Sequence, residues 1–243
     1  MFSINQNAVF KPASARLLFA IGALLALAAP VLAQSSSFNP GVYCTYTQGG
    51  WGAAPAGNNP GSILATHFTS VYPAGVEVGI PMHYSMKFTS AKAIEVYLPA
   101  GGKGDVLKSN VTNPTSTPSG VFGGQVLALQ LNVNFNDTGK IGDGQSPTFG
   151  DLLISDTHTS FDAMTVRDVL AAANWALGGG MLSDIGIGDY SIRGNVSGTA
   201  NLNDFVSFLN QGFDNCNPSD WVKDHLQEPG SVNTCTPDNC PLS

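Results

Sequence analysis

The fold of this chain depends on one apolar stretch, GVFGGQVLALQLNVNF, at residues 120–135. Its second half, from Leu129 to Phe135, alternates strictly between apolar and polar residues, which is typical of a half-buried strand. Apolar residues nevertheless also recur at helical spacing, at Phe122, Val126, Leu129 and Val133. The residues of this stretch, taken by themselves, leave strand and helix open.

A second periodic stretch predicts a helix over residues 166–177. Thr165 followed by Asp168 resembles a capping box with a shorter acid, and three glycines at 178–180 end the pattern. One apolar face results, made of Val166, Val169, Leu170, Ala173 and Leu177. The same pattern recurs over residues 202–213, which predicts a further helix.

The remaining elements are expected to be short. Alternation at 76–78 and 84–88 predicts a β-hairpin, and residues 152–154 predict a short buried strand. Shorter helices are expected at residues 61–68, at 91–98 and after Ser219. The sequence therefore predicts the α+β class: a helix-rich, disulfide-bonded single domain with a small antiparallel sheet, built from the hairpin and residues 151–155.

Residues 1–33 are typical of a secretory signal peptide. Two cations precede an apolar run at 17–29, and small residues before the expected cleavage point after Ala33 satisfy the usual rule. An uncleaved membrane anchor is the alternative, because the apolar run approaches the length that spans a bilayer. We expect a secreted protein, extracellular or at the cell surface, with no membrane span after cleavage.

Composition restricts the partners of the mature chain. The full chain carries a net charge of −7, and only 11% of its residues are charged. Removal of Lys11 and Arg16 with the signal leaves 8 cations against 17 acids, a net charge of −9. Nucleic-acid binding needs clustered cations, so we expect no nucleic-acid partner. The mature chain is expected to form a compact extracellular domain at 34–226 and a Cys-containing, Pro-rich tail at 227–243.

Four cysteines lie in the mature part: Cys44, Cys216, Cys235 and Cys240. An even number in an exported chain favours two disulfides, for which three pairings are possible. We favour Cys235–Cys240 as a short local loop, with Cys44–Cys216 joining the start of the domain to its end. Zinc is the competing interpretation, but the usual two-residue spacing and a nearby histidine pair are missing.

No motif in the sequence marks a catalytic centre. The Gly-x-Ser-x-Gly pattern of a nucleophile elbow is missing. His158, between Asp156 and Asp162, is a candidate proton carrier in a loop. We therefore expect a non-enzymatic protein, with a secreted hydrolase acting on polysaccharide or peptide as the alternative.

Two weaker patterns point to ligand binding. Calcium needs a concentration of oxygen ligands, and the candidates are Asp137, Asp143 and Asp151. No other cofactor is expected. Tyr46 and Trp51 are candidate residues for a sugar-stacking platform, so a carbohydrate- or calcium-binding module is the third functional hypothesis.

The sequence CTYTQGGWG at residues 44–52, followed by GNNPG at 57–61, resembles a module of secreted bacterial surface proteins. Further similar stretches include FTSA at 88–91, the apolar stretch at 120–133, and FDNC at 213–216. The resemblance covers about residues 44–225. It implies a helix at 120–135 in place of the strand.

The resemblance also implies a function at the cell surface or in an extracellular matrix. The family has no established biochemical activity, so the resemblance implies no catalytic residues. Many relatives carry a cysteine near the position of Ser155, so their cysteine pairing does not transfer to this chain. We expect a non-enzymatic structural protein of adhesion, matrix or self-assembly. Its expected partners are itself or other extracellular components, including polysaccharide.

Overall fold

The structure, a computed structural model, describes residues 37–80, 83–194 and 200–230. All of them belong to one unit of the chain, Ala33–Ser243. The expected signal peptide lies outside the described residues, and so do Cys235 and Cys240.

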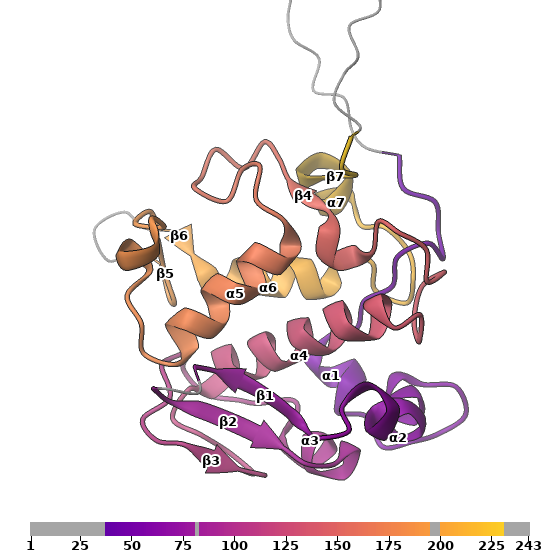
Figure 1. Ribbon diagram of the computed structural model, residues 1–243, viewed down its shortest axis with the longest axis vertical. Coiled ribbons are helices and arrows are strands. Elements are labelled where there is room, and N and C mark those ends of the chain that lie inside the picture. Colours follow the sequence, from indigo (N-terminus) through magenta and orange to yellow (C-terminus); the bar gives the residue numbers. More distant parts are fainter. Residues whose placement is uncertain (1–36, 81–82, 195–199, 231–243) are drawn as a thin grey trace, which may run out of the picture. The chain divides into compact units, whose positions relative to one another are not determined.

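Helix α4 (Gly120–Asp137) is the central element (Figure 1). The helix implied by the family resemblance is confirmed, and the strand alternative is wrong. Asn132, a polar residue of the alternating stretch, is 0% exposed, and Asn136, which follows that stretch, is 3% exposed. Because α4 is buried on most sides and two of its polar residues lie inside, the usual signal of an amphipathic helix is weak.

Two further helices pack along α4: α5 (Val166–Leu177) and α6 (Leu202–Gln211). The predicted capping box at the start of α5 is confirmed, since Thr165 and Asp168 exchange both hydrogen bonds. Helix α6 begins at the Asn201 cap and ends two residues before Phe213, the end that the sequence predicted. Phe213 is nevertheless fully buried, so it still contributes to the core.

The predicted hairpin forms one edge of a mixed sheet on the other side of α4 (Figure 1). Strand β1 (Val76–Gly79) pairs antiparallel with β2 (Ser85–Phe88), with Val76 opposite Phe88. Strand β3 (Val111–Thr112) joins β2 in parallel orientation. The sheet is therefore small, as predicted, but only its hairpin is antiparallel.

Residues 151–155 do not join this sheet, so that part of the prediction is wrong. Strand β4 (Leu153–Ile154) pairs antiparallel with β7 (Leu226–Gln227) near the end of the described chain. A third pair, β5 (Tyr190–Ser191) with β6 (Ala200–Asn201), is parallel. A two-residue strand can pair along either edge, and its sequence carries too little pattern to name the partner.

Short helices complete the fold, and several of them begin after a side chain that caps the first turn. Asn59 caps α2 (Pro60–Val71), which is longer than predicted. Ser90 caps α3 (Ala91–Tyr97), and Ser219 caps α7 (Asp220–His225). The others are α1 (Gln48–Trp51) and the 3-10 turns η1 (Phe149–Asp151) and η2 (Leu182–Ile185).

The favoured disulfide between Cys44 and Cys216 is present, with 4.0 Å between the Cα atoms. It joins segments 172 residues apart. Beside it, the Thr45 N–H donates to the Phe213 carbonyl at 2.9 Å. In the ranges that the structure describes, no helix combines the length and the apolar character needed to cross a bilayer.

Candidate functional site

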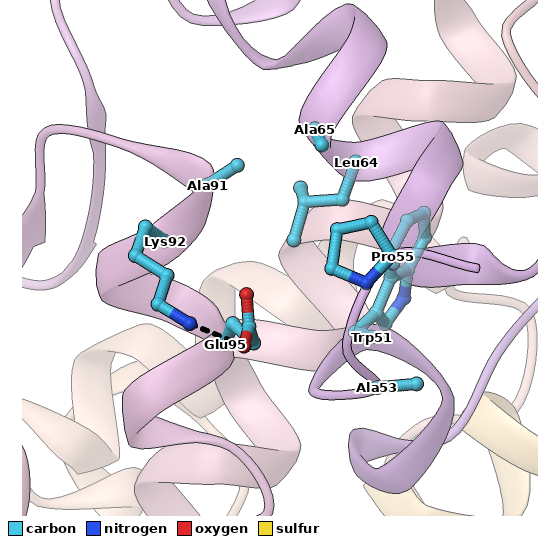
Figure 2. A pocket seen from close by; sticks show the side chains of 9 residues that line it. Trp51, Ala53, Pro55, Leu64, Ala65, Ala91, Lys92 and Glu95 are labelled. Carbon is cyan, nitrogen blue, oxygen red and sulfur yellow. Dashed lines mark hydrogen bonds and ion pairs between the residues drawn. The ribbon is translucent and has the colours of Figure 1, made fainter.

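An apolar hollow of about 170 Å³ lies between α2 and α3 (Figure 2). Its lining is mostly apolar and includes Trp51, Pro55 and Leu64. The Lys92–Glu95 ion pair lies at its edge, as Figure 2 shows. Lys92 and Glu95 are the charged residues of the lining, and they neutralise each other.

The size and chemistry of this hollow limit what it can bind. Sites for small organic ligands usually have about 300–1,000 Å³. A hollow of about 170 Å³ instead suits one aliphatic or proline side chain of a partner. Its lining contains no histidine or cysteine and no second acid beside Glu95, so it does not supply an acid–base pair for hydrolysis.

The two candidate sugar-stacking residues are both buried. Tyr46 is 8% exposed and Trp51 is 0% exposed, and their rings meet edge to face with centroids 5.2 Å apart. Phe135 of α4 packs against the other side of the cluster, 5.0 Å from the Trp51 ring. In this arrangement the two aromatic rings stabilise the core and present no open face to a sugar.

Asn132, on the buried side of α4, holds the segment that carries these aromatics. Its Oδ1 accepts hydrogen bonds from the Tyr46 N–H at 2.8 Å and from the Trp51 indole N–H at 3.0 Å. Its Nδ2 donates to the Tyr46 carbonyl and to the Asn210 side chain, both at 2.9 Å. The side-chain amide therefore uses both of its N–H groups and both lone pairs of its oxygen.

Asn136 repeats the contact one turn further along α4. Its Nδ2 donates to the Cys44 carbonyl at 2.7 Å, and its Oδ1 accepts from the Cys44 N–H at 3.4 Å. Asn132 and Asn136, which we call the asparagine clasp, therefore pair with the main chain of Cys44 and Tyr46 as a neighbouring strand would. Their alternation with apolar residues in the sequence was the signal of this role, although it resembled a strand pattern.

Two of the three candidate calcium ligands are brought together, but around a cation of the protein itself. Arg167 donates to Asp137 through both terminal nitrogens, at 2.8 and 3.1 Å, and to Asp151 at 3.1 Å. Partial burial raises the pKa of Asp151, but hydrogen bonds from Thr148 and Arg167 outweigh it and lower that pKa. The hydrogen bond to Asp137 raises the pKa of Arg167. Calcium would have to compete with a guanidinium that is already in place.

The third candidate ligand, Asp143, serves its own turn, since its Oδ1 accepts from the Gln145 N–H at 2.9 Å. Within the described ranges, no group of three or more His, Cys, Asp or Glu side chains is placed to hold a metal ion. The calcium site stays a prediction, and a titration with calcium is its test.

His158 lies in an exposed turn that Asp162 organises. Asp162 accepts hydrogen bonds from the main-chain N–H groups of Thr157 and His158, both at 2.9 Å, and from the Thr157 hydroxyl. Partial burial raises the pKa of Asp162, but these hydrogen bonds outweigh it and lower the pKa. It is therefore the main chain of His158 that binds the carboxylate here, and Asp162 acts as a turn-forming residue.

An exposed aromatic surface on α6 and α7 was missed in the sequence. Phe208 is 46% exposed and stacks on the Trp221 ring, with centroids 5.5 Å apart and planes 16° from parallel. The His225 ring lies 5.1 Å from the Trp221 ring, measured between ring centroids. We call Phe208, Trp221 and His225 the outer aromatic face. The sequence could have indicated this face, because Phe208 lies outside the apolar face that the buried residues of α6, such as Phe205 and Leu209, form.

Comparisons with protein-family models, with curated proteins and with solved structures found no match for this chain.

Proposed function

We propose that this chain is a non-enzymatic extracellular protein that acts by adhesion, in a matrix or by self-assembly. The observation that carries the proposal is that its candidate reactive acids are already engaged in structural contacts. Asp137 and Asp151 share Arg167, and Asp162 accepts from two main-chain N–H groups of its own turn. If one of these acids acted as a catalytic acid or base, it would give up hydrogen bonds that hold the local structure.

An extracellular location is supported by two independent features. The sequence of residues 1–33 has the pattern of a signal peptide. The Cys44–Cys216 disulfide is of the kind that persists in oxidising compartments. The resemblance of residues 44–225 to bacterial surface modules agrees with both.

A binding role is supported by apolar groups at the surface. Large apolar side chains stand exposed on several elements, among them Val96 at 52%, Met181 at 65% and Phe208 at 46%. The hollow between α2 and α3 adds a recess that suits one apolar side chain of a partner. Singly exposed apolar residues are ordinary, so the stronger support comes from Phe208, whose ring lies 5.5 Å from that of Trp221 at the surface.

Purified mature protein, residues 34–243, tests the proposal. We expect concentration-dependent higher oligomers in sedimentation, or retention on envelope or matrix material of the source cell. We also expect no turnover on a panel of polysaccharides and peptides. Turnover that His158→Ala abolishes, while the melting temperature stays unchanged, would overturn the proposal in favour of the hydrolase.

Calcium provides a separate arm of the same experiment. A ligand at 100 times its Kd adds about 2.7 kcal/mol to the apparent stability of the folded state. A calcium-dependent rise of that size, lost in Asp137→Asn, would establish the third hypothesis, a calcium-binding module. The matched control is Asp184→Asn, which removes an exposed acid on η2.

A further inference from the structure

We propose that the outer aromatic face binds a lysine or arginine side chain of a basic partner segment. This inference rests on the proposed binding function and names the chemistry of the partner. The face consists of Phe208 of α6 and Trp221 of α7, whose rings stack, together with His225 of α7. Two carboxylates, Asp204 and Asp224, complete the proposed site.

The rings are held in place from beneath. Trp221 is partly buried and packs edge to face on Phe205, with centroids 5.5 Å apart and planes 83° from parallel. Phe205 is 7% exposed and belongs to the core. Phe208 stacks on Trp221 from outside, and nearly half of its surface is open. A partner therefore meets a preformed aromatic surface, and little side-chain freedom remains to be lost on binding.

The acids are placed beside the rings by helix geometry. Asp204 precedes Phe208 by four residues on α6, and Asp224 follows Trp221 by three residues on α7. Residues at these spacings lie on the same side of a helix, about 5–6 Å apart at Cβ. Both acids are exposed.

The charge of this region is strongly one-sided. Residues 200–230 contain five acids and one cation, Lys223, whose ammonium group pairs with Asp220 at 2.8 Å. Helix α6 has no lysine or arginine. A cation above an aromatic ring is attracted by the ring face, and nearby carboxylates add to that attraction. The charge therefore complements a basic partner better than a neutral sugar.

The tail that follows this region does not supply the cation. Residues 231–243, which follow this region in the sequence, contain no lysine or arginine. This tail therefore cannot supply the group that the site selects. A lysine-rich or arginine-rich segment of a partner protein has the required chemistry.

The test measures binding of a fluorescently labelled hexalysine peptide to the mature protein by anisotropy, at low and at high salt. A hexaglutamate peptide of the same length is the negative probe. We expect Phe208→Ala and Phe208→Leu each to weaken hexalysine binding about two- to fivefold, the equivalent of a cation–π contact at an exposed site. Asp224→Asn is expected to weaken it by a similar factor, and less at high salt.

Matched controls separate this site from the overall negative charge. Val96→Ala removes an equally exposed apolar side chain on α3, and Asp184→Asn removes an exposed acid on η2. Equal weakening by Asp184→Asn and Asp224→Asn, with no effect of Phe208→Ala, would overturn the site. Far-UV circular dichroism confirms that each variant is folded.

Two other results of this experiment would point to a different ligand. Binding of a neutral oligosaccharide that Phe208→Ala abolishes, without binding of hexalysine, would overturn the proposal in favour of a sugar site. Oligomers lost in Phe208→Ala, again without hexalysine binding, would overturn it in favour of an interface between copies. In both cases the proposed extracellular binding function would stand. Failure of the cation site can therefore be distinguished from failure of the proposed function.

Discussion

Replacement of Asn132 by alanine tests the asparagine clasp directly. The change removes the partner of four buried groups: the N–H and carbonyl of Tyr46, the indole N–H of Trp51 and the side-chain oxygen of Asn210. A buried polar group left without a partner costs about 1–3 kcal/mol, so the four groups together cost at least about 4 kcal/mol. That loss is a large share of the roughly 5–15 kcal/mol by which a domain is stable.

Urea unfolding at neutral pH, followed by far-UV circular dichroism under non-reducing conditions, measures this loss. With a slope of roughly 2 kcal/mol per molar urea, the unfolding midpoint of Asn132→Ala should fall by about 2 M or more. Asn134→Ala is the matched control, because Asn134 lies on the same helix and is only half-buried; its side chain accepts from Gln130 at 3.0 Å and also contacts the Tyr72 hydroxyl. It should lose no more than about 1 kcal/mol.

Equal losses in the two variants would refute the reasoning, since the clasp would then contribute no more than the half-buried contacts of Asn134. If Asn132→Ala does not fold, Asn210→Ala replaces it in the comparison. Asn210 accepts from Asn132 at 2.9 Å and donates to the Gln125 carbonyl at 3.0 Å and to the Gln125 side chain at 2.8 Å. Its loss should fall between those of the other two variants.

Three further predictions follow from other parts of the structure. Reduction of Cys44–Cys216, whose loop spans 172 residues, should lower the free energy of unfolding by about 5 kcal/mol in the loop-closure model; an unchanged urea midpoint in reductant would contradict this. The pKa of Asp162 is lowered from its ordinary value of 3.8, so the ionised carboxylate stabilises the fold at pH values above 3.8. This stability is lost as the pH falls through the folded-state pKa. Asp162→Asn should therefore be less stable than wild type at neutral pH, and the difference should vanish in acid; a gap that persists in melting curves at low pH would disprove the assignment. Gly61→Ala should cost about 1–3 kcal/mol, because the added methyl group meets the Ala53 carbonyl, whereas Gly101→Ala, which meets nothing within 4 Å, should be close to neutral in thermal melts.

The amphipathic helices could be predicted from the sequence because each has one buried face and a capping residue. Helix α5 shows this best, with Thr165 and Asp168 marking its start. Helix α4 could not be predicted in this way, since two of its polar residues, Asn132 and Asn136, are satisfied by the main chain at Cys44 and Tyr46 rather than by water. That partner lies about 90 residues away, and no local pattern reveals it. The helical spacing of the apolar residues left helix and strand open, and the resemblance to a family decided for the helix.

Sequence reasoning found candidate acids but not their organisation. Asp137 and Asp151 do lie together, yet Arg167 joins them, and no spacing rule connects an arginine of α5 to two acids before it. The outer aromatic face was missed because its two main rings come from helices that are separate in the sequence. The pairing of β4 with β7 was missed for the same reason, since a two-residue strand does not specify its partner.

The first described segment is joined to parts of the chain that are made later. These contacts set the order in which the domain can fold during synthesis. Tyr46 leaves the ribosome 86 residues before Asn132, and Cys44 leaves 172 residues before Cys216. Until those partners exist, the segment has nothing to bind, and the buried amides of α4 have nothing to satisfy them. The segment that is made first is therefore anchored in two stages: to α4 once Asn136 has been made, and through the disulfide only when nearly all of the described chain has been made.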